Sequence, residues 1–337
     1  MHTFHIAKER KSVMNQIVSS VVDGIWPTMM MPLKDDLSLD LDGLERLMYW
    51  YKEQGAHGIF ALCYSSEIRN MTFDERKTVM KFVVDHLPKG MGLVAAGHVA
   101  DDIETQIEEF KVLRDLGAPA LVMIGNRLAK QEEGEDVFLR NAMRILEEIP
   151  DINFGMYECP YPYKRLFHIE TLSLLARTNR FLFMKETSCD LNIISAKVKA
   201  SEGTPFKIYN ANAATALDSW KNGCAGFSGI MCNFHTDLYV RMWDAFKEGD
   251  DNLAIPLQKA LGMFSVYEMM QYPLCAKAYQ KEALGIGGLS RYKDIKDMRY
   301  SYYVQLEQLR YFEDMLRSRI KEYDSQKARG ENPGSLL

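Results

Sequence analysis

The sequence predicts an α/β fold, a (β/α)8 TIM barrel followed by a C-terminal helical appendage. Eight short apolar runs recur at fairly even intervals along the chain. The segments between them carry helical periodicity, as Leu41, Leu44, Leu47 and Met48 do after the first run. Strict alternation of strands and helices implies parallel strands with right-handed crossovers, and eight such units close most naturally into a barrel.

The eight apolar runs are the expected strands, and cap residues mark where several helices begin. Thr72 with Glu75, and Asp101 with Glu104, have the spacing of a capping box, and Asp190 can cap the helix after the sixth run. An open doubly wound sheet is disfavoured, because no glycine-rich phosphate-binding sequence follows the first run. The expected strands span residues 24–31, 58–62, 93–97, 120–124, 153–157, 181–185, 207–210 and 226–230.

The chain after the eighth unit has no strand-like run. Helical periodicity covers residues 253–272 and 295–323, with a glycine-rich break at 285–288, so we expect this part to be a helical appendage. The predicted organisation therefore has four parts: an N-terminal extension (1–23), the barrel (24–250), the C-terminal helices (251–325) and a frayed polar tail (326–337).

The composition is typical of a soluble globular protein. Hydrophobic residues make up 47% and charged residues 26% of the 337, and no stretch reaches the roughly 18 uninterrupted apolar residues of a membrane helix. The net charge of -5 comes from interspersed acids and bases. We therefore expect a small-molecule substrate, and neither nucleic acid nor a membrane as partner.

The cysteines indicate a reduced, cytoplasmic protein. No two of them have two-residue spacing, and the N-terminal segment lacks the continuous apolar stretch of a secretory signal. Several fall near strand ends and, with His98, suggest a metal site, but their spacing matches no zinc pattern. We therefore expect no metal and no cofactor. The six are Cys63, Cys159, Cys189, Cys224, Cys232 and Cys275.

Lys185 is the strongest candidate for chemistry. It follows four bulky apolar residues at 181–184, which are typical of a strand buried on both faces, so its amine is expected at the carboxyl end of the sixth strand. Burial there lowers the pKa of a lysine toward the range in which the nucleophilic neutral form exists, and such lysines form Schiff bases with carbonyl substrates. A strand-end lysine that extends to solvent is the alternative.

Two other strand ends carry groups that suit a Schiff-base site. Tyr157, after the fifth strand, can shuttle protons while the imine forms. Ser65 and Ser66, after the second strand, can hold the carboxylate of a 2-oxo acid with their hydroxyls and the nearby backbone amides. The alternatives are a rim tyrosine and a plain helix cap.

These segments resemble the dihydrodipicolinate synthase and N-acetylneuraminate lyase family of class I Schiff-base pyruvate aldolases. Residues 184–190 are similar to its lysine signature, residues 157–160 to its tyrosine-x-x-proline segment, and residues 64–67 occupy the place of two hydroxyl residues, a glycine and a glutamate. The resemblance implies a homo-oligomer, a dimer or tetramer. It also implies site roles: Lys185, Tyr157 and Ser65 as catalytic residues, and Tyr64, Ser66, Thr187 and Ser228 as substrate-binding residues.

The chain departs from both main branches of that family. Pro162 stands where the synthase branch has an arginine for the second substrate, and Leu128 stands where it has a tyrosine borrowed from a neighbouring subunit. Residues 211–214, Ala-Asn-Ala-Ala, lack the acidic groups with which the sialic acid branch binds its sugar. Lysine biosynthesis and sialic acid cleavage are therefore both disfavoured.

Three functions stay open. The first is a lyase or aldolase that makes or breaks a carbon–carbon bond of pyruvate or a longer 2-oxo acid through a lysine imine. The second is a dehydratase of 2-oxo-3-deoxy sugar acids that uses the same lysine, and the third is a non-catalytic binding barrel. Tyr161, Tyr163, Lys164 and Arg165 follow the fifth strand, where they either contact an anionic or aromatic acceptor or form a solvated loop.

Overall fold

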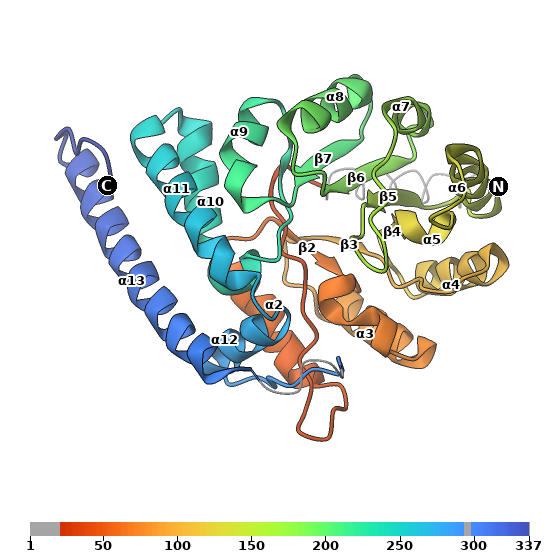
Figure 1. The fold of residues 1–337 in the computed structure, drawn as a ribbon, viewed down its shortest axis with the longest axis horizontal. Helices are drawn as coiled ribbons and strands as arrows, with labels where there is room; N and C mark the ends of the chain where they lie inside the picture. The colour runs from red at the N-terminus through yellow and green to blue at the C-terminus, as the bar shows by residue number, and fades with distance from the viewer. Residues whose placement is uncertain (1–20, 293–297, 337) are drawn as a thin grey trace, which may run out of the picture.

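The computed structural model describes residues 21–292 and 298–336, and Figure 1 shows their arrangement around a central ring of strands. All strand pairs are parallel, in the order β1-β8-β7-β6-β5-β4-β3-β2. A parallel bridge between Thr28 and Phe60 joins the two ends and closes the barrel. The predicted fold class is confirmed. The strands are β1 (Gly24–Ile25), β2 (Gly58–Ala61), β3 (Gly92–Ala95), β4 (Ala120–Ile124), β5 (Asn153–Tyr157), β6 (Phe181–Glu186), β7 (Lys207–Asn210) and β8 (Gly226–Phe227).

Helices connect the strands and surround the barrel (Figure 1). Short 3-10 turns follow β2 and β7: η1 (Tyr64–Ser66), η2 (Ile68–Asn70) and η3 (Ala213–Thr215). The helices of the barrel are α2 (Leu41–Glu53), α3 (Phe73–His86), α4 (Ile103–Asp115), α5 (Gly125–Leu128), α6 (Glu135–Glu148), α7 (Ile169–Arg177), α8 (Leu191–Ser201), α9 (Ala216–Lys221) and α10 (Cys232–Glu248).

The helix caps follow the sequence with one exception. Thr72 forms the predicted capping box, and Asp190 accepts from the Asn192 amide over 2.8 Å at the start of α8. The cap predicted for α4 at Asp101 is wrong, because Asp102 accepts from the Thr105 amide instead. Asp101 forms an ion pair with Arg127 and is therefore not available as the cap.

Aromatic side chains fill the interior of the barrel below its carboxyl end. The Phe183 ring lies 5.6 Å from Trp26, 5.6 Å from Phe60 and 4.7 Å from Tyr209, centroid to centroid. All four residues are fully buried, and each such side chain contributes about 1.5–3 kcal/mol through its removal from water. Because these aromatic side chains fill the middle of the barrel, the carboxyl ends of the strands remain as the place for a site.

Three further helices form the C-terminal appendage: α11 (Asp251–Glu268), α12 (Leu274–Leu284) and α13 (Tyr300–Ala328). They lie beside α10 and α2, on the side of the barrel away from α4 to α7 (Figure 1). Sequence periodicity did not reveal α12, although a proline before it and a left-handed Gly285 after it are ordinary start and stop signals.

The C-terminal end of the chain differs from its predicted description. The last helix reaches Ala328, and Leu336 donates its amide to the Asn252 carbonyl over 3.1 Å, so the segment expected to be frayed lies against α11. The start predicted for the last helix, at residues 295–297, lies outside the described residues, as does the N-terminal extension before residue 21.

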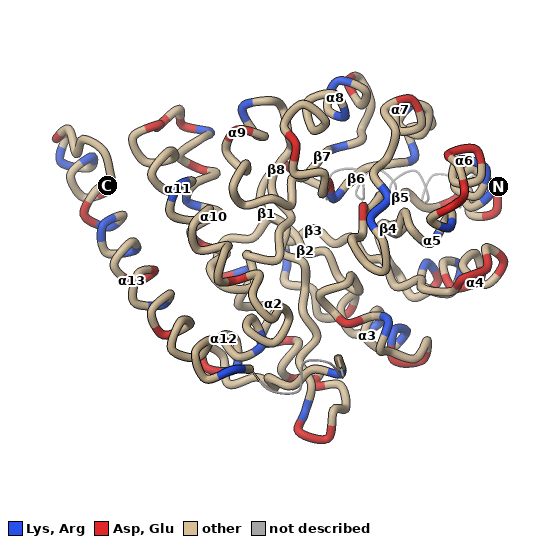
Figure 2. Tube along the Cα trace, viewed as in Figure 1, with Lys and Arg blue, Asp and Glu red and all other residues tan. Residues whose placement is uncertain are grey.

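Charged residues of both signs are spread over the outer helices of the described chain, as Figure 2 shows. A concentrated basic surface is the electrostatic footprint of nucleic-acid binding. None of the helices in the described part of the chain is both long and apolar enough to span a bilayer.

Candidate active site

Lys185 lies at the carboxyl end of β6 with its side chain inside the barrel. Every residue of β6 is buried, and Lys185 is only 4% exposed. On one side its strand pairs with β5, where Tyr157 is its direct partner, and on the other with β7, where Tyr209 is. The alternative of a lysine that extends to solvent is therefore not what the structure shows.

Burial lowers the pKa of the Lys185 amine. The neighbours that act against this shift are the thiols of Cys63, Cys159 and Cys232, which favour the charged form. Burial raises the pKa of each of these thiols, so they are uncharged at neutral pH and give the ammonium form little support. Burial thus shifts the Lys185 amine toward its neutral, nucleophilic form.

Tyr157 lies against this amine. The Lys185 Nζ atom is 5.2 Å from the centroid of the Tyr157 ring, and Tyr157 is 3% exposed. Burial raises the pKa of Tyr157 well above its ordinary value. The phenol therefore keeps its proton at neutral pH and is available as a proton donor beside the amine.

The two serines after β2 have different surroundings. Ser66 donates to the Met29 carbonyl over 2.6 Å, which fixes the turn to the segment after β1. Ser65 donates to the Thr28 hydroxyl over 3.1 Å, and that hydroxyl is a partner it can exchange for a substrate oxygen. Tyr64 packs its ring 5.6 Å from the Tyr161 ring. Of the two serines, Ser65 is thus the one with an exchangeable hydroxyl.

Thr187 and Ser228, the other two predicted binding residues, also differ. Thr187 donates its hydroxyl to the Glu158 carbonyl over 2.8 Å and its amide to the Glu158 carboxylate over 2.9 Å, so its polar groups hold the end of β6 in place. Ser228 follows β8 and is fully buried, and its amide bonds the Asn210 carbonyl over 2.8 Å. Among the described residues its hydroxyl has no hydrogen-bond partner.

A buried ion cluster behind the site was missed by the sequence analysis. Lys197 of α8 bonds Glu158 over 2.5 Å and Glu186 over 2.8 Å, and the side chains of all three are fully buried. Burial raises the pKa of Glu158, while Lys197 acts against that shift. Since Glu158 follows Tyr157 and Glu186 follows Lys185, the cluster fixes the two strand ends that carry the predicted catalytic pair. The sequence does carry a signal for this cluster, since Glu158 and Glu186 each follow directly after an apolar run.

The loop after β5 is mostly structural. Lys164 donates to the Thr187 carbonyl over 2.8 Å, Arg165 pairs with Glu135 over 2.8 Å, and the Tyr163 hydroxyl donates to the carbonyl of Asn126 over 3.2 Å. These three contacts tie neighbouring loops together.

Tyr161 is the member of that loop that stays free for a ligand. It is 48% exposed, and the Arg69 guanidinium lies 5.1 Å from its ring centroid. Together with Tyr64 it forms an aromatic wall at the mouth of the barrel.

His98 and the cysteines do not form a metal site. The His98 Nδ1 lies 3.1 Å from Gln106 Oε1, and its Nε2 accepts from the Ile124 amide over 2.7 Å, so both ring nitrogens are occupied. Burial lowers the pKa of His98 to about 3, so the ring is neutral. Within the described ranges no three His, Cys, Asp or Glu side chains are grouped to hold an ion.

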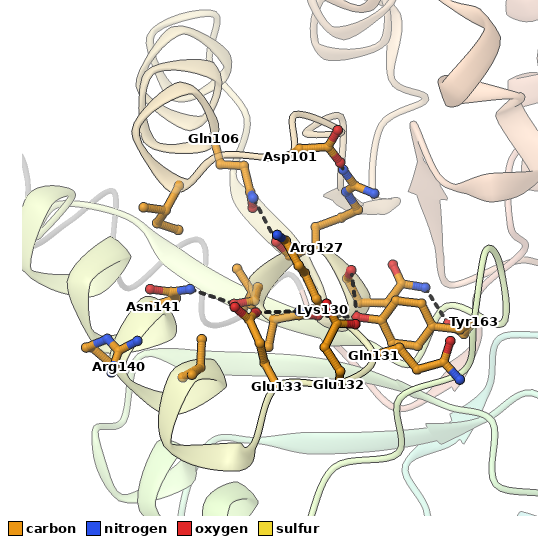
Figure 3. A pocket seen from close by; sticks show the side chains of 15 residues that line it. Asp101, Gln106, Arg127, Lys130, Gln131, Glu132, Glu133, Arg140, Asn141 and Tyr163 are labelled. Carbon is orange, nitrogen blue, oxygen red and sulfur yellow. Dashed lines mark hydrogen bonds and ion pairs between the residues drawn. The ribbon is translucent and has the colours of Figure 1, made fainter.

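A separate cavity of about 670 Å³ lies outside the barrel mouth, between α4, α5 and α6 (Figure 3). Arg127, Lys130 and Tyr163 line it, whereas Lys185 and Tyr157 do not. Leu128 lies at its inner wall with 1% of its surface exposed. The leucine is therefore not presented on the outside of the chain.

Enzymes built on a closed parallel barrel carry their active sites at the carboxyl ends of the strands, the end at which the buried Lys185 amine lies. The chain belongs to the Dihydrodipicolinate synthetase family, whose sequence model matches residues 21–290. This membership makes it an enzyme of the carbon–carbon lyase type.

Individual relatives are similar at low identity over most of their length. An uncharacterized DapA-like lyase of Pyrococcus furiosus is 26% identical over 249 residues, which cover 71% of this chain and 79% of the relative. A 4-hydroxy-tetrahydrodipicolinate synthase of Alcanivorax borkumensis is 27% identical over 243 residues, covering 72% and 80%. The crystal structure of YagE, a prophage protein of the same family from E. coli K12 solved in complex with pyruvate, matches with a TM-score of 0.76 at 18% identity, covering 85% and 97%.

Proposed function

We propose that this protein is a Schiff-base-forming lyase that makes or breaks a carbon–carbon bond of pyruvate or a longer 2-oxo acid through an imine on Lys185. The observation that carries the proposal is the position of that amine: it is buried at the carboxyl end of β6, its pKa is lowered by burial, and it lies over the ring of Tyr157. The pyruvate bound by YagE, a structural relative, supports the same substrate class.

The reaction starts with attack of the neutral Lys185 nitrogen on the ketone carbon, which gives a carbinolamine. Protonation of its hydroxyl releases water and leaves a protonated imine. In the cleavage direction, a base takes the proton from the hydroxyl on C4, the C3–C4 bond breaks, an aldehyde leaves, and the electron pair moves through C3 into the imine to give an enamine. Protonation at C3 and hydrolysis then return the 2-oxo acid and the free amine.

Tyr157 and Ser65 are assigned the supporting roles. The Tyr157 phenol, protonated and next to the amine, passes protons during carbinolamine formation and loss of water. Ser65 turns its hydroxyl from Thr28 to the carboxylate or the reacting oxygen of the substrate. Ser228, which follows β8 at the same end of the barrel, is assigned to line the pyruvate pocket through its backbone.

We also propose a cytoplasmic homo-oligomer, a dimer or tetramer. Six free cysteines, five of them buried, suit a reducing compartment. Large apolar side chains stand exposed on the appendage, among them Met263 at 65%, Met269 at 57% and Tyr311 at 68%. Apolar groups gathered in this way are common at subunit contacts, and sedimentation at several protein concentrations tests this part of the proposal.

A panel of 2-oxo-3-deoxy sugar acids and 4-hydroxy-2-oxo acids, assayed for release of pyruvate, tests the function. Wild-type protein is expected to release pyruvate and an aldehyde from at least one member, and K185M from none. K281M, which removes an exposed lysine of α12, is the matched control. Loss of water without pyruvate would make the protein the dehydratase instead, and tight binding without any turnover would make it a binding barrel.

A further inference from the structure

Thr28 carries a buried hydroxyl on the inner face of the barrel, just after β1. It forms a parallel bridge with Phe60 of β2. Residues that lie side by side in parallel strands direct their side chains to the same face of the sheet. The Phe60 ring lies inside the barrel, 5.4 Å from the Tyr157 ring and 5.6 Å from the Phe183 ring. The Thr28 side chain therefore faces the interior as well.

The alternation of side chains along the strands gives the same placement. Trp26 and Thr28 are two residues apart, as are Phe183 and Lys185, so the side chains of each pair point to one face. The rings of Trp26 and Phe183 meet inside the barrel, with their centroids 5.6 Å apart. Thr28 and Lys185 thus lie on the carboxyl side of the same aromatic contact.

The Thr28 hydroxyl accepts a hydrogen bond from the Ser65 hydroxyl over 3.1 Å. Two hydroxyls carry two protons, and this bond uses only one of them. Within residues 21–292 and 298–336, this is the one side-chain hydrogen bond that either hydroxyl makes. Thr28 is fully buried and Ser65 is 3% exposed, so one donor of this pair is left without a partner inside the barrel.

We propose that Thr28 is a substrate-binding residue of this site, and that its hydroxyl and that of Ser65 together hold the carboxylate of the 2-oxo acid. The inference rests on the proposed Schiff-base function and extends it. When the substrate binds, each hydroxyl turns its proton to one of the two carboxylate oxygens, which only accept hydrogen bonds. The protonated imine on Lys185 balances the negative charge.

The neighbouring serine cannot supply this second hydroxyl. Ser66 donates to the Met29 carbonyl over 2.6 Å, and it is fully buried in that position. Its proton is therefore used by the backbone. Thr28 offers a proton that no such contact takes up.

The position of the Thr28 hydroxyl is fixed by its backbone. The Met29 amide donates to the Phe60 carbonyl and the Phe60 amide to the Pro27 carbonyl, each over 2.9 Å. The Thr28 carbonyl accepts from Asn233 Nδ2 over 3.0 Å. Because a threonine side chain is stiff about its first bond, a fixed backbone leaves its hydroxyl few positions. A donor that is already oriented loses little conformational freedom when the substrate binds.

The test measures the pyruvate concentration for half-maximal borohydride trapping in the full-length protein. T28V keeps the shape of the side chain and removes its hydroxyl. It is expected to raise this concentration about tenfold, because one hydrogen bond to a charged group is lost. T28S keeps the hydroxyl and is expected to stay within about threefold of wild type.

T236V is the matched control. Thr236 is also fully buried, but its hydroxyl donates to the Cys232 carbonyl within α10 over 2.5 Å. This variant is expected to leave the half-saturating pyruvate concentration unchanged. The melting temperatures of T28V and T236V are measured alongside.

A second ligand separates carboxylate binding from a structural effect. Methyl pyruvate keeps the reactive ketone and replaces the carboxylate with a neutral ester. Hydrogen bonds to charged groups are about twice as strong as those to neutral groups, so a tenfold effect of T28V on pyruvate corresponds to about threefold on the ester.

The outcomes are distinct. Absence of any trapping in wild-type protein would refute the proposed function itself. If wild type is trapped, an unchanged half-saturation in T28V, or an equal shift in T236V, would overturn the role of Thr28 and leave the lyase proposal standing. An equal loss in T28S would overturn it too, as would equal effects of T28V on pyruvate and its methyl ester.

Discussion

Glu67 and Lys277 form a buried ion pair that joins the loop after β2 to helix α12. Each side chain is 2% exposed. Glu67 has a left-handed backbone, with φ of 58°, and its second carboxylate oxygen accepts from the Ser290 hydroxyl over 3.0 Å and the Arg291 amide over 2.7 Å. The turn that carries Ser65 is therefore held in place by the appendage and not by the barrel alone.

Removal of the lysine from this pair is expected to destabilise the protein strongly. K277M leaves the Glu67 carboxylate buried without a cation, which costs about 3–5 kcal/mol of unfolding free energy. Urea unfolding measures this loss. K281M, on the exposed side of the same helix, is expected to change the unfolding free energy by no more than about 0.5 kcal/mol. A small effect of K277M, equal to that of K281M, would show that the pair does not hold the loop.

The buried Lys185 amine is expected to lower the unfolding free energy of the protein. Burial of an amine without a carboxylate partner disfavours the folded state, so K185M should raise the unfolding free energy at pH 7 by about 1 kcal/mol. The pKa of Lys185 in the folded protein lies below the ordinary value of 10.5. As pH falls, protonation of this amine therefore stabilises the unfolded state more than the folded state. The stability advantage of K185M over wild type should vanish above pH 10.5 and grow as pH is lowered. Denaturant unfolding at several pH values measures it, and a difference that does not change with pH would show a solvated amine.

The rate of imine formation should depend on pH through the same amine. Only the neutral form attacks the ketone, so the rate rises with pH while Lys185 is protonated and levels off once it is neutral. Because burial lowers the pKa of Lys185, the plateau is expected at a pH below 10.5. Stopped-flow mixing with pyruvate measures the profile. A rate that still increases through pH 10.5 would indicate an ordinary, exposed lysine.

Tyr161 is expected to affect the acceptor and not pyruvate. Its half-exposed ring forms the mouth wall with Tyr64, outside the position of the amine. Y161A should raise the KM for the acceptor several-fold, because loss of the ring contact costs about 1 kcal/mol of binding free energy. The pyruvate concentration for half-maximal trapping should stay the same. Y300A, which removes a tyrosine that is 82% exposed on α13, is the control. If Y161A changed the KM for the acceptor and the half-saturating pyruvate concentration equally, Tyr161 would not be specific to acceptor binding.

His235 is expected to make stability depend on pH above neutrality. It lies between Glu313, 2.8 Å from its Nδ1, and Glu268, 3.0 Å from its Nε2. Burial acts to lower its pKa, but the two carboxylates outweigh it and raise the pKa of His235 to about 10. The imidazolium therefore stabilises the fold fully below pH 6.5, and this contribution is lost as pH rises toward 10. The stability difference between wild type and H235Q, measured by denaturant unfolding, should shrink over that interval, and a constant difference would contradict the assignment.

Local sequence patterns were sufficient for the barrel and for the residues at its strand ends. Lys185 and Tyr157 were predicted because each follows a buried apolar run, and parallel strands bring such ends together. The same argument predicts Ser65 beside them. Whether these residues perform catalysis stays a prediction.

Residues that reach the site by tertiary packing could not be predicted in this way. Lys197 is on the inner face of a helix, and only the folded chain brings it between Glu158 and Glu186. The family resemblance implies that Thr187 binds substrate, and in the structure its hydroxyl bonds the backbone carbonyl of Glu158.

Mass spectrometry of the protein after borohydride treatment with pyruvate tests the central claim most directly. The account predicts that the peptide containing Lys185 gains the mass of one reduced pyruvate, that no other lysine peptide does, and that K185M gains none. An unmodified Lys185 peptide, or an adduct spread evenly over exposed lysines, would contradict it.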